Sequence, residues 1–575
     1  MKKHYLITIL TIVGVFTSCD DDYLDRLPST DPTPETFFES EQALELYTNS
    51  FYTYLSKNEF QQDYKSDNMA TFDLPVDQKT ALYESPNELG SGGWSWTRIR
   101  DINFFIDRCS NASAISTSVK NEQLAIAKFF RAWFYFDKVK KFGDVPWYSK
   151  PLRSDDVEQL YKPRDSREVV MDSVLADIDF AVKYGMANIS QNRVTKWTAL
   201  ALKSRICLYE GTWRKYHTEV GLPNSNKFLS EAFEAAKQLI DSKKYTLYTT
   251  GDIKDYYNFF NLEKANSEEV IMAIDLAEGN IGDYNKNFTT TSVGTRGITK
   301  SLVHEYLNVN GTPFNSSETV PWFDEFTNRD PRLAQTSMPM NFKRIGETEI
   351  VLPWFGQNHT GYQVVKRVGS ADYDNGDPRD IIVFRLAEVY LNYAEAKAEL
   401  GTITQEDLDM TINELRDRVQ MPHLTLAPTL DSYIDNLYLS TSNPLILEIR
   451  RERRVELAIE GFRFDDLMRW KEGQLLRNNS EGIYAQLNTY MDRDRDGIFD
   501  LYVYDNDKPS DAGNFPKVDF FKLSGNNSLS NGANGRILPY NKPLPAYQDW
   551  EYLLPIPTEE IILNPTLIQN EGWDN

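Results

Sequence analysis

The most specific chemical motif in the chain is an aspartate-rich segment in its C-terminal part. It reads Asp492-Arg493-Asp494-Arg495-Asp496-Gly497-Ile498-Phe499-Asp500. Carboxylates at positions 1, 3, 5 and 9, with glycine at position 6, match the first part of a calcium-binding loop. The pattern predicts a structural Ca²⁺ site formed by Asp492, Asp494, Asp496 and Asp500. Position 12, usually a bidentate glutamate, is Val503, so water or another segment must complete the ligand shell. The alternative is a solvated turn whose charge Arg493 and Arg495 neutralise.

Motifs typical of catalytic sites are missing from the sequence. There is no His-Glu-x-x-His, Gly-x-Ser-x-Gly, glycine-rich phosphate loop or Cys-x-x-Cys, and the five histidines are scattered. We therefore expect a binding protein that requires no cofactor apart from the Ca²⁺ predicted above. A glycoside hydrolase needs only two well-placed carboxylates, which the 85 acidic residues could supply, so this class stays an alternative. A surface adhesin or scaffold is a third.

Cys19 stands in a context that predicts lipid attachment. Lys2 and Lys3 precede an apolar run over residues 5–16, and Thr17-Ser18 lead into the cysteine. A basic start, a short apolar segment and small residues before the break are typical of a secretory signal. The apolar run is shorter than the ~20 residues that a membrane-spanning helix needs. We expect residues 1–18 to be a signal peptide and Cys19 to be acylated. The alternative is an ordinary cleaved signal with an incidental cysteine.

The net charge restricts the ligands. Formal charge is −23, from 62 basic and 85 acidic residues. Nucleic acid is excluded as a partner, because binding polyphosphate requires clustered Lys and Arg. The same charge would repel acidic polysaccharides unless a basic patch intervenes. Loop composition fits neutral or basic carbohydrate, and it fits peptide equally.

Aromatic side chains in long loops are the candidate ligand contacts. Residues 60–97, 245–380 and 472–560 do not show helical patterns and are rich in Gly, Asn, Asp, Pro and aromatic residues. Loops of this length are usually functional or contain further structure, and exposed rings suit the apolar faces of sugars. The predicted contacts, with core packing as the alternative for each ring, are Tyr83, Trp322, Trp354, Phe355 and Tyr362.

The rest of the chain is dominated by helical periodicity. Apolar residues recur at helical spacing over residues 41–55, 122–142, 165–184, 195–209, 229–242, 384–400, 405–419 and 444–470. Small residues at pair junctions favour tetratricopeptide-like stacking. We predict a mainly α, tetratricopeptide-like superhelix with long ligand-binding loops and little β-structure. The predicted divisions are an acylated leader (19–40) and a single body (41–575), which has a helical part (41–245) and a loop-rich and helical part (246–575).

Several phrases in one order resemble the SusD/RagB family. They cover nearly the whole mature chain and include Tyr23-Leu24-Asp25, Trp94-Ser95-Trp96, Arg131-Ala132-Trp133-Phe134-Tyr135-Phe136, Phe142-Gly143-Asp144-Val145-Pro146, Arg329-Asp330-Pro331-Arg332, Arg450-Arg451-Glu452-Arg453-Arg454 and Glu460-Gly461-Phe462-Arg463. The arginine-rich helix suggests a partly buried ionic network, in which Glu448 could pair with Arg451 and Arg453 with Glu456.

The resemblance implies a function that composition cannot give. Members of this family capture glycans, or in some branches peptides, and cap a SusC-like TonB-dependent outer-membrane barrel. Asp20-Asp21-Asp22 resembles the surface-export signal of Bacteroidetes-type lipoproteins. The implied location is therefore the outer membrane, with the body lipid-anchored and facing the cell exterior.

Overall fold

The computed structural model describes residues 37–55, 63–70, 93–276, 297–314 and 317–573. Cys19, Tyr83 and most of the predicted leader lie outside these ranges. The longer helices are α2 (Glu41–Ser50), α3 (Thr97–Asn111), α4 (Thr117–Phe142), α6 (Arg167–Tyr184), α7 (Lys196–Tyr216), α8 (Ser225–Asp241), α14 (Leu386–Glu399) and α18 (Pro444–Glu456). The shorter ones are α5 (Val157–Leu160), α9 (Asp255–Phe260), α11 (Lys300–Glu305), α12 (Trp322–Phe326), α13 (Leu333–Thr336), α15 (Gln405–Asp409), α16 (Ile412–Arg418), α17 (Ser432–Leu437), α19 (Arg463–Arg469) and α20 (Thr558–Leu563).

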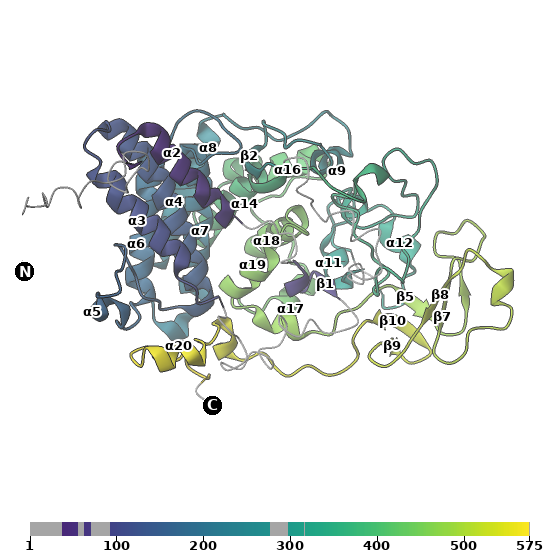
Figure 1. Ribbon diagram of the computed structural model, residues 1–575. Coiled ribbons are helices and arrows are strands. Elements are labelled where there is room, and N and C mark those ends of the chain that lie inside the picture. Colours follow the sequence, from purple (N-terminus) through teal and green to yellow (C-terminus); the bar gives the residue numbers. More distant parts are fainter. Residues whose placement is uncertain (1–36, 56–62, 71–92, 277–296, 315–316, 574–575) are drawn as a thin grey trace, which may run out of the picture.

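The predicted mainly helical fold is confirmed. α3 packs against α4, α4 against α6, α7 against α8, and α8 against α14. In Figure 1 these helices stand together on the left, α18 and α19 occupy the middle, and the short strands of the C-terminal part (yellow-green) lie on the right. Helices begin where polar caps satisfy free amides: Ser116 starts α4, Ser166 starts α6 and Thr195 starts α7.

Two of the predicted helices are each divided in the structure. Residues 405–419 form α15 and α16, separated by Met410 and Thr411. Residues 444–470 form α18 and α19, separated where Ile459 (φ 61°) and Gly461 (φ 86°) adopt left-handed backbone conformations that a helix cannot contain. The apolar periodicity continues across both breaks, and so did not reveal them.

In the described part of the chain, the β-structure forms small sheets. The two-stranded sheets pair β1 (Met69–Ala70) with β3 (Gly297–Ile298) and β2 (Val270–Ile274) with β4 (Ile381–Arg385), both antiparallel. The three-stranded sheets have the orders β5-β10-β9 and β6-β7-β8. Their strands are β5 (Tyr484–Gln486), β6 (Tyr490–Met491), β7 (Leu501–Tyr504), β8 (Asp519–Lys522), β9 (Ser528–Asn531) and β10 (Asn534–Leu538).

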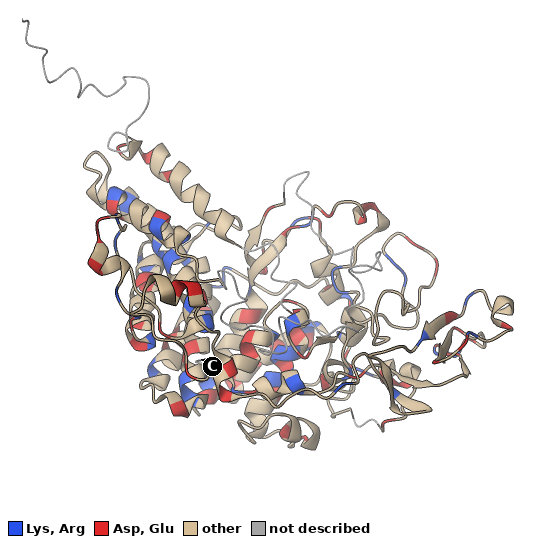
Figure 2. Cartoon of the chain, turned by 60° about the horizontal axis from the view of Figure 1, so that its bottom comes forward, with Lys and Arg blue, Asp and Glu red and all other residues tan. Residues whose placement is uncertain are grey.

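A buried ionic network connects α18 to neighbouring segments. Glu456 accepts ion pairs from Arg385 (2.8 Å), Arg418 (2.5 Å) and Arg332 (3.1 Å), and its carboxylate is fully buried. Figure 2 shows Lys and Arg intermingled with Asp and Glu in the centre of the molecule. The predicted Glu448–Arg451 pair forms at 3.0 Å. Arg453, however, pairs with Asp466 of α19 at 2.9 Å. The expected pairing of residues one turn apart holds for the exposed surface of a helix, whereas Arg453 is buried and a neighbouring helix provides its partner.

Candidate ligand-binding site

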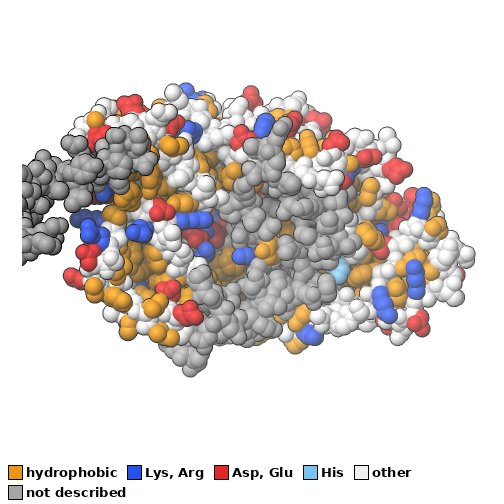
Figure 3. Space-filling view, in the orientation of Figure 1, with side chains coloured by type: hydrophobic (Ala, Val, Ile, Leu, Met, Phe, Trp, Pro, Cys, Tyr) orange, Lys and Arg blue, Asp and Glu red, His pale blue; other side chains and the backbone are white. Residues whose placement is uncertain are grey.

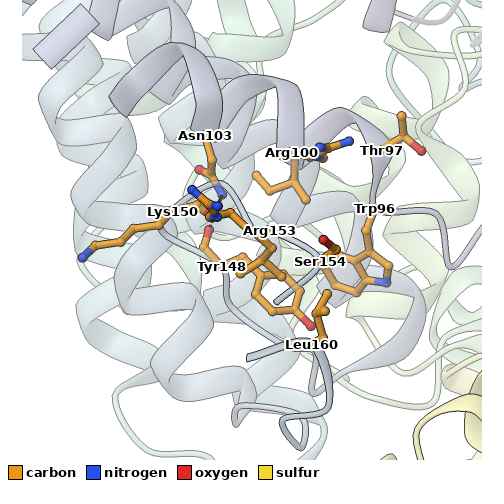
Figure 4. Close-up of a pocket in the computed structure, with 11 residues that line it drawn as sticks. Trp96, Thr97, Arg100, Asn103, Tyr148, Lys150, Arg153, Ser154 and Leu160 are labelled. Carbon is orange, nitrogen blue, oxygen red and sulfur yellow. Dashed lines mark hydrogen bonds between the residues drawn. The ribbon is translucent and has the colours of Figure 1, made fainter. Parts of the chain in front are cut away.

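A cavity of about 470 Å³ opens beside the N-terminal end of α3. This volume lies in the range of small-molecule sites. α3 contributes its first turns, and the segment after Pro146 forms the opposite wall, with Leu160 of α5 at the edge (Figure 4). The residues that line it are Trp96, Thr97, Ile99, Arg100, Asn103, Tyr148, Lys150, Leu152, Arg153, Ser154 and Leu160.

Helical spacing separates the roles of the α3 side chains. Ile99 and Asn103, four residues apart, face inward and are only 2% and 1% exposed. Thr97 and Arg100, three residues apart, lie on the exposed side of the same turns. The helix therefore places a buried floor of Ile99 and Asn103 and an exposed polar rim on one side of the cavity.

A chain of polar contacts fixes the opposite wall. The side-chain amide of Asn103 donates to the backbone carbonyl of Tyr148 at 2.7 Å, and the backbone amide of Tyr148 donates to the hydroxyl of Tyr135 at 2.6 Å. Arg131 donates to the Asn103 side-chain oxygen (2.9 Å) and to Asp177 (2.8 Å). Asn103, Tyr135, Arg131 and Asp177 are all buried. These hydrogen bonds therefore hold the wall in place without a ligand.

Two aromatic rings meet in the cavity. Trp96 and Tyr148 form an edge-to-face pair with ring centroids 5.6 Å apart and an interplanar angle of 89°. Burial, with a smaller contribution from Asp165, raises the pKa of the Tyr148 hydroxyl to about 12. This hydroxyl is therefore protonated at neutral pH and can donate a hydrogen bond. Rings beside hydrogen-bond donors suit a sugar, which has apolar C–H faces and hydroxyl edges.

The charged residues in the described part of the cavity lining are all basic. They are Arg100, Lys150 and Arg153, and none of the described lining residues is Asp or Glu. Figure 3 shows Lys and Arg side chains among hydrophobic surface on this side of the molecule, at the left. The described part of the lining thus contains no pair of carboxylates of the kind that glycoside hydrolysis requires.

The four predicted aromatic contacts that the structure describes lie outside this cavity. Trp322, Phe355 and Tyr362 are at most 2% exposed and belong to one hydrophobic cluster. Phe355 stacks on Phe521, and the Tyr362 hydroxyl donates to Glu325. These three rings therefore occupy the core, which was the stated alternative, and their faces are not open to a ligand. Trp354 is 46% exposed.

Four residues of the cavity were not predicted as contacts: Tyr148, Arg100, Lys150 and Arg153. Trp96 was not named either, although it lies in residues 60–97, one of the loop regions in which contacts were expected. One usable signal was the aromatic pair Trp147-Tyr148 directly after the family-like phrase that ends at Pro146. The basic residues gave no signal, because they come from two segments about 50 residues apart that only the fold brings together.

The aspartate loop connects β6 to β7. Oxygen atoms of Asp492, Asp494 and Asp500 lie within 4.8 Å of one another, whereas Asp496 is outside this group. Gly497 has φ of 87° and its amide donates to Asp492. Burial and then the nearby carboxylates raise the pKa of Asp494. Arg495 pairs with Asp324 of α12 at 2.6 Å, so among the two arginines of the loop only Arg493 contacts a loop aspartate, Asp500. This donor set fits a hard cation such as Ca²⁺.

If the loop binds Ca²⁺, chelation will lower the thermal unfolding midpoint of the protein. A ligand that binds only the folded state stabilises it by about 2.7 kcal/mol when its concentration is 100 times Kd. The double variant Asp492→Asn/Asp494→Asn should lose the response to chelator. A matched variant, Asp505→Asn/Asp507→Asn, changes two exposed aspartates just beyond the loop and should keep it. Identical melting of the unaltered protein with Ca²⁺ and with chelator would favour the solvated turn.

Comparison with known proteins places the chain in a family. The SusD family matches residues 260–573, more than half of the chain, and a second family, described as starch-binding and associating with the outer membrane, matches residues 34–217. A SusD-like protein of Formosa agariphila is 24% identical over 523 residues, covering 82% of this chain and 90% of the relative. A SusD-like protein of Bacteroides ovatus is 22% identical over 493 residues, covering 81% and 82%.

Solved structures agree on the fold. A SusD-like carbohydrate-binding protein of Bacteroides fragilis has a TM-score of 0.69 at 20% identity, covering 93% of this chain and 100% of its own. Another SusD-like protein of that species has a TM-score of 0.68 at 22% identity, covering 94% and 100%. The chain belongs to the SusD family. Within its described part, no helix combines the length and hydrophobicity needed to cross a membrane.

Proposed function

We propose that this protein binds glycans at the cell surface and holds them in the cavity between α3 and the segment after Pro146. The observation that carries the proposal is the Trp96–Tyr148 pair in a 470 Å³ cavity whose described lining contains no carboxylate. Such a site retains a sugar without cleaving it. The naming of a relative as carbohydrate-binding and of the second matching family as starch-binding supports the same ligand class.

Oligosaccharide binding to the soluble form, lacking residues 1–19, tests the proposal. We expect retention without cleavage, with Kd between about 1 mM and 1 μM. Trp96→Ala should weaken binding about tenfold, because it removes half of the aromatic pair. Trp354→Ala, an equal truncation of a half-exposed ring elsewhere, should leave the affinity unchanged. Titration calorimetry measures the affinities and chromatography of the recovered sugar detects cleavage.

Three results would contradict this assignment. Cleavage products would identify a glycoside hydrolase, and binding of peptides in place of sugars would identify a peptide-binding homologue. Loss of affinity in Trp354→Ala but not in Trp96→Ala would move the site to the Trp354 loop.

Delivery to a partner completes the proposed function. We propose lipid anchoring through Cys19 at the outer membrane, facing the exterior, and association with a SusC-like TonB-dependent barrel. The description of the second matching family as associating with the outer membrane supports this location. Two partners held on one membrane have a raised effective concentration, so a dissociable contact can suffice. Mild cross-linking before detergent extraction should recover a barrel with the protein, and its consistent absence would contradict the partnership.

A further inference from the structure

The charged side chains in the described part of the cavity lining are opposite in sign to the net charge of the protein. The protein carries a formal charge of −23, yet the charged side chains among the described lining residues are Arg100, Lys150 and Arg153. A neutral sugar needs hydrogen-bond donors and acceptors but no local excess of positive charge. Against a negative background, this excess is the local basic patch that an acidic ligand requires.

The cations of this cavity are free to meet a ligand. Among the described residues, neither Arg100 nor Lys150 has a side-chain hydrogen bond or an ion pair, and both are exposed. Arg153 pairs with Asp155 at 3.1 Å, but these side chains are 79% and 71% exposed, and such pairs contribute little. The Asp156 carboxylate accepts the Arg153 backbone amide at 2.7 Å. Asp155 is thus solvated and Asp156 is directed to the backbone, while Asp101, next to Arg100 in the sequence, accepts the Tyr54 hydroxyl at 3.3 Å.

The cations differ in where they point. In Figure 4, Arg153 crosses the opening between Asn103 and Tyr148, and Arg100 extends from α3 toward Thr97. The Lys150 ammonium extends away from the other labelled side chains. Guanidinium groups are planar donors that bind carboxylate and sulfate oxygens in pairs. Arg153 is therefore the residue placed to contact an anion in the opening, and Arg100 provides a second guanidinium on the Thr97 side of the rim.

We propose that this cavity selects acidic oligosaccharides, in which one carboxylate or sulfate ester contacts Arg153 in the opening and another contacts Arg100 at the rim, while a sugar ring packs on Trp96 and Tyr148. The proposal rests on the glycan-binding function proposed above and specifies its ligand class. Carboxylate and sulfate share the chemistry that the arginines recognise, and the choice between them is left to experiment.

The test compares matched charged and neutral probes on the soluble form. A galacturonate tetramer is paired with its methyl ester, and a sulfated galactose tetramer with its desulfated parent. We expect at least one charged probe to bind about tenfold more tightly than its neutral partner, since charge-assisted hydrogen bonds are roughly twice as strong as neutral ones. Raising NaCl from about 50 to 300 mM should reduce that advantage, because salt screens exposed charges. The probe with the advantage distinguishes uronate from sulfate.

Substitutions distinguish direct contact between the arginines and the ligand from a general electrostatic attraction by the positive charge at the rim. Arg153→Gln and Arg100→Gln should each weaken the charged probe about tenfold and leave its neutral partner within about threefold. Lys150→Gln removes the same charge from the same rim, and should change the charged probe less than about threefold because its ammonium points away. Unchanged thermal midpoints would show that all three variants fold.

The outcomes distinguish selectivity for acidic ligands from the proposed glycan-binding function on which it rests. Equal binding of charged and neutral probes, still weakened by Trp96→Ala, would overturn acidic selectivity and leave glycan binding standing. Equal losses in all three charge variants would overturn the assigned contacts, because the effect would then be one of net charge. Failure of every probe to bind would overturn the acidic class, and failure of neutral oligosaccharides as well would also remove the proposed function.

Discussion

Cys19→Ala is expected to release the protein from membranes and to abolish acyl-chain labelling. Each buried methylene of an acyl chain contributes about 0.8 kcal/mol, so two or three chains anchor a protein almost permanently and their loss removes the attachment. The effect should be close to all-or-none. Fractionation of membranes from soluble protein, with incorporation of a labelled palmitate analogue, measures both parts of the result.

Cys109→Ala is the matched control. Cys109 is fully buried in α3 and is a free thiol in the structure, so its replacement changes a core atom without touching the predicted anchor. This variant should stay membrane-bound and labelled. If Cys19→Ala also remained bound with its label intact, the lipoprotein assignment would be wrong.

Glu456→Gln is expected to cause the largest loss of stability among single charge substitutions. Removing one partner from a buried ionic network leaves uncompensated charge and typically costs about 3–5 kcal/mol. Here the charge of Glu456 compensates Arg385, Arg418 and Arg332. Denaturant unfolding followed by tryptophan fluorescence measures the loss. Glu234→Gln, which alters an exposed residue of α8, should change stability by less than about 0.5 kcal/mol. Equal midpoints for the two variants would contradict a stabilising role of the network.

The same carboxylate predicts an acid-dependent loss of stability. Burial alone would raise the pKa of Glu456, but Arg418, Arg385 and Arg332 hold it well below its usual range. An unfolded glutamate has a pKa of about 4.3. The carboxylate therefore stabilises the fold above about pH 4.3, and this contribution falls as pH drops below that value toward the folded pKa. Glu456→Gln should show a smaller difference in stability between pH 7 and pH 3 than the unaltered protein.

Helix positions were predictable because their signals are local. Ser166 and Thr195 cap α6 and α7 at their predicted starts, and apolar spacing follows from the helical repeat. The predicted start of α4 at residue 122 was five residues late, because α4 begins after the Ser116 cap. The aspartate loop is local as well: Gly497 and the alternate aspartates determine its geometry through neighbouring backbone. The break at Ile459 and Gly461 was missed because the apolar periodicity continues across it.

Ring exposure was not predictable from the sequence. Trp322 and Trp354 are both tryptophans in loop-rich sequence, yet one is 2% exposed and the other 46%. Composition treats them alike, because burial is decided by which segments cover a side chain. Trp322 is covered by a cluster that includes residues as distant as Ile537.

The sequence by itself determined the helical class, the local geometry of the aspartate loop and, through motif order, the family, and it predicts the anchor at Cys19. Each of these depends on residues that are close along the chain or on their linear order. Only the tertiary structure decided the cavity and the ionic network. Arg100 and Arg153 share one opening because α3 and the segment after Pro146 pack together through Asn103. Glu456 forms ion pairs with Arg332 and Arg385, which are more than 70 residues away in the sequence. Buried charges pair with partners that are close in space, and separation along the sequence does not predict that closeness.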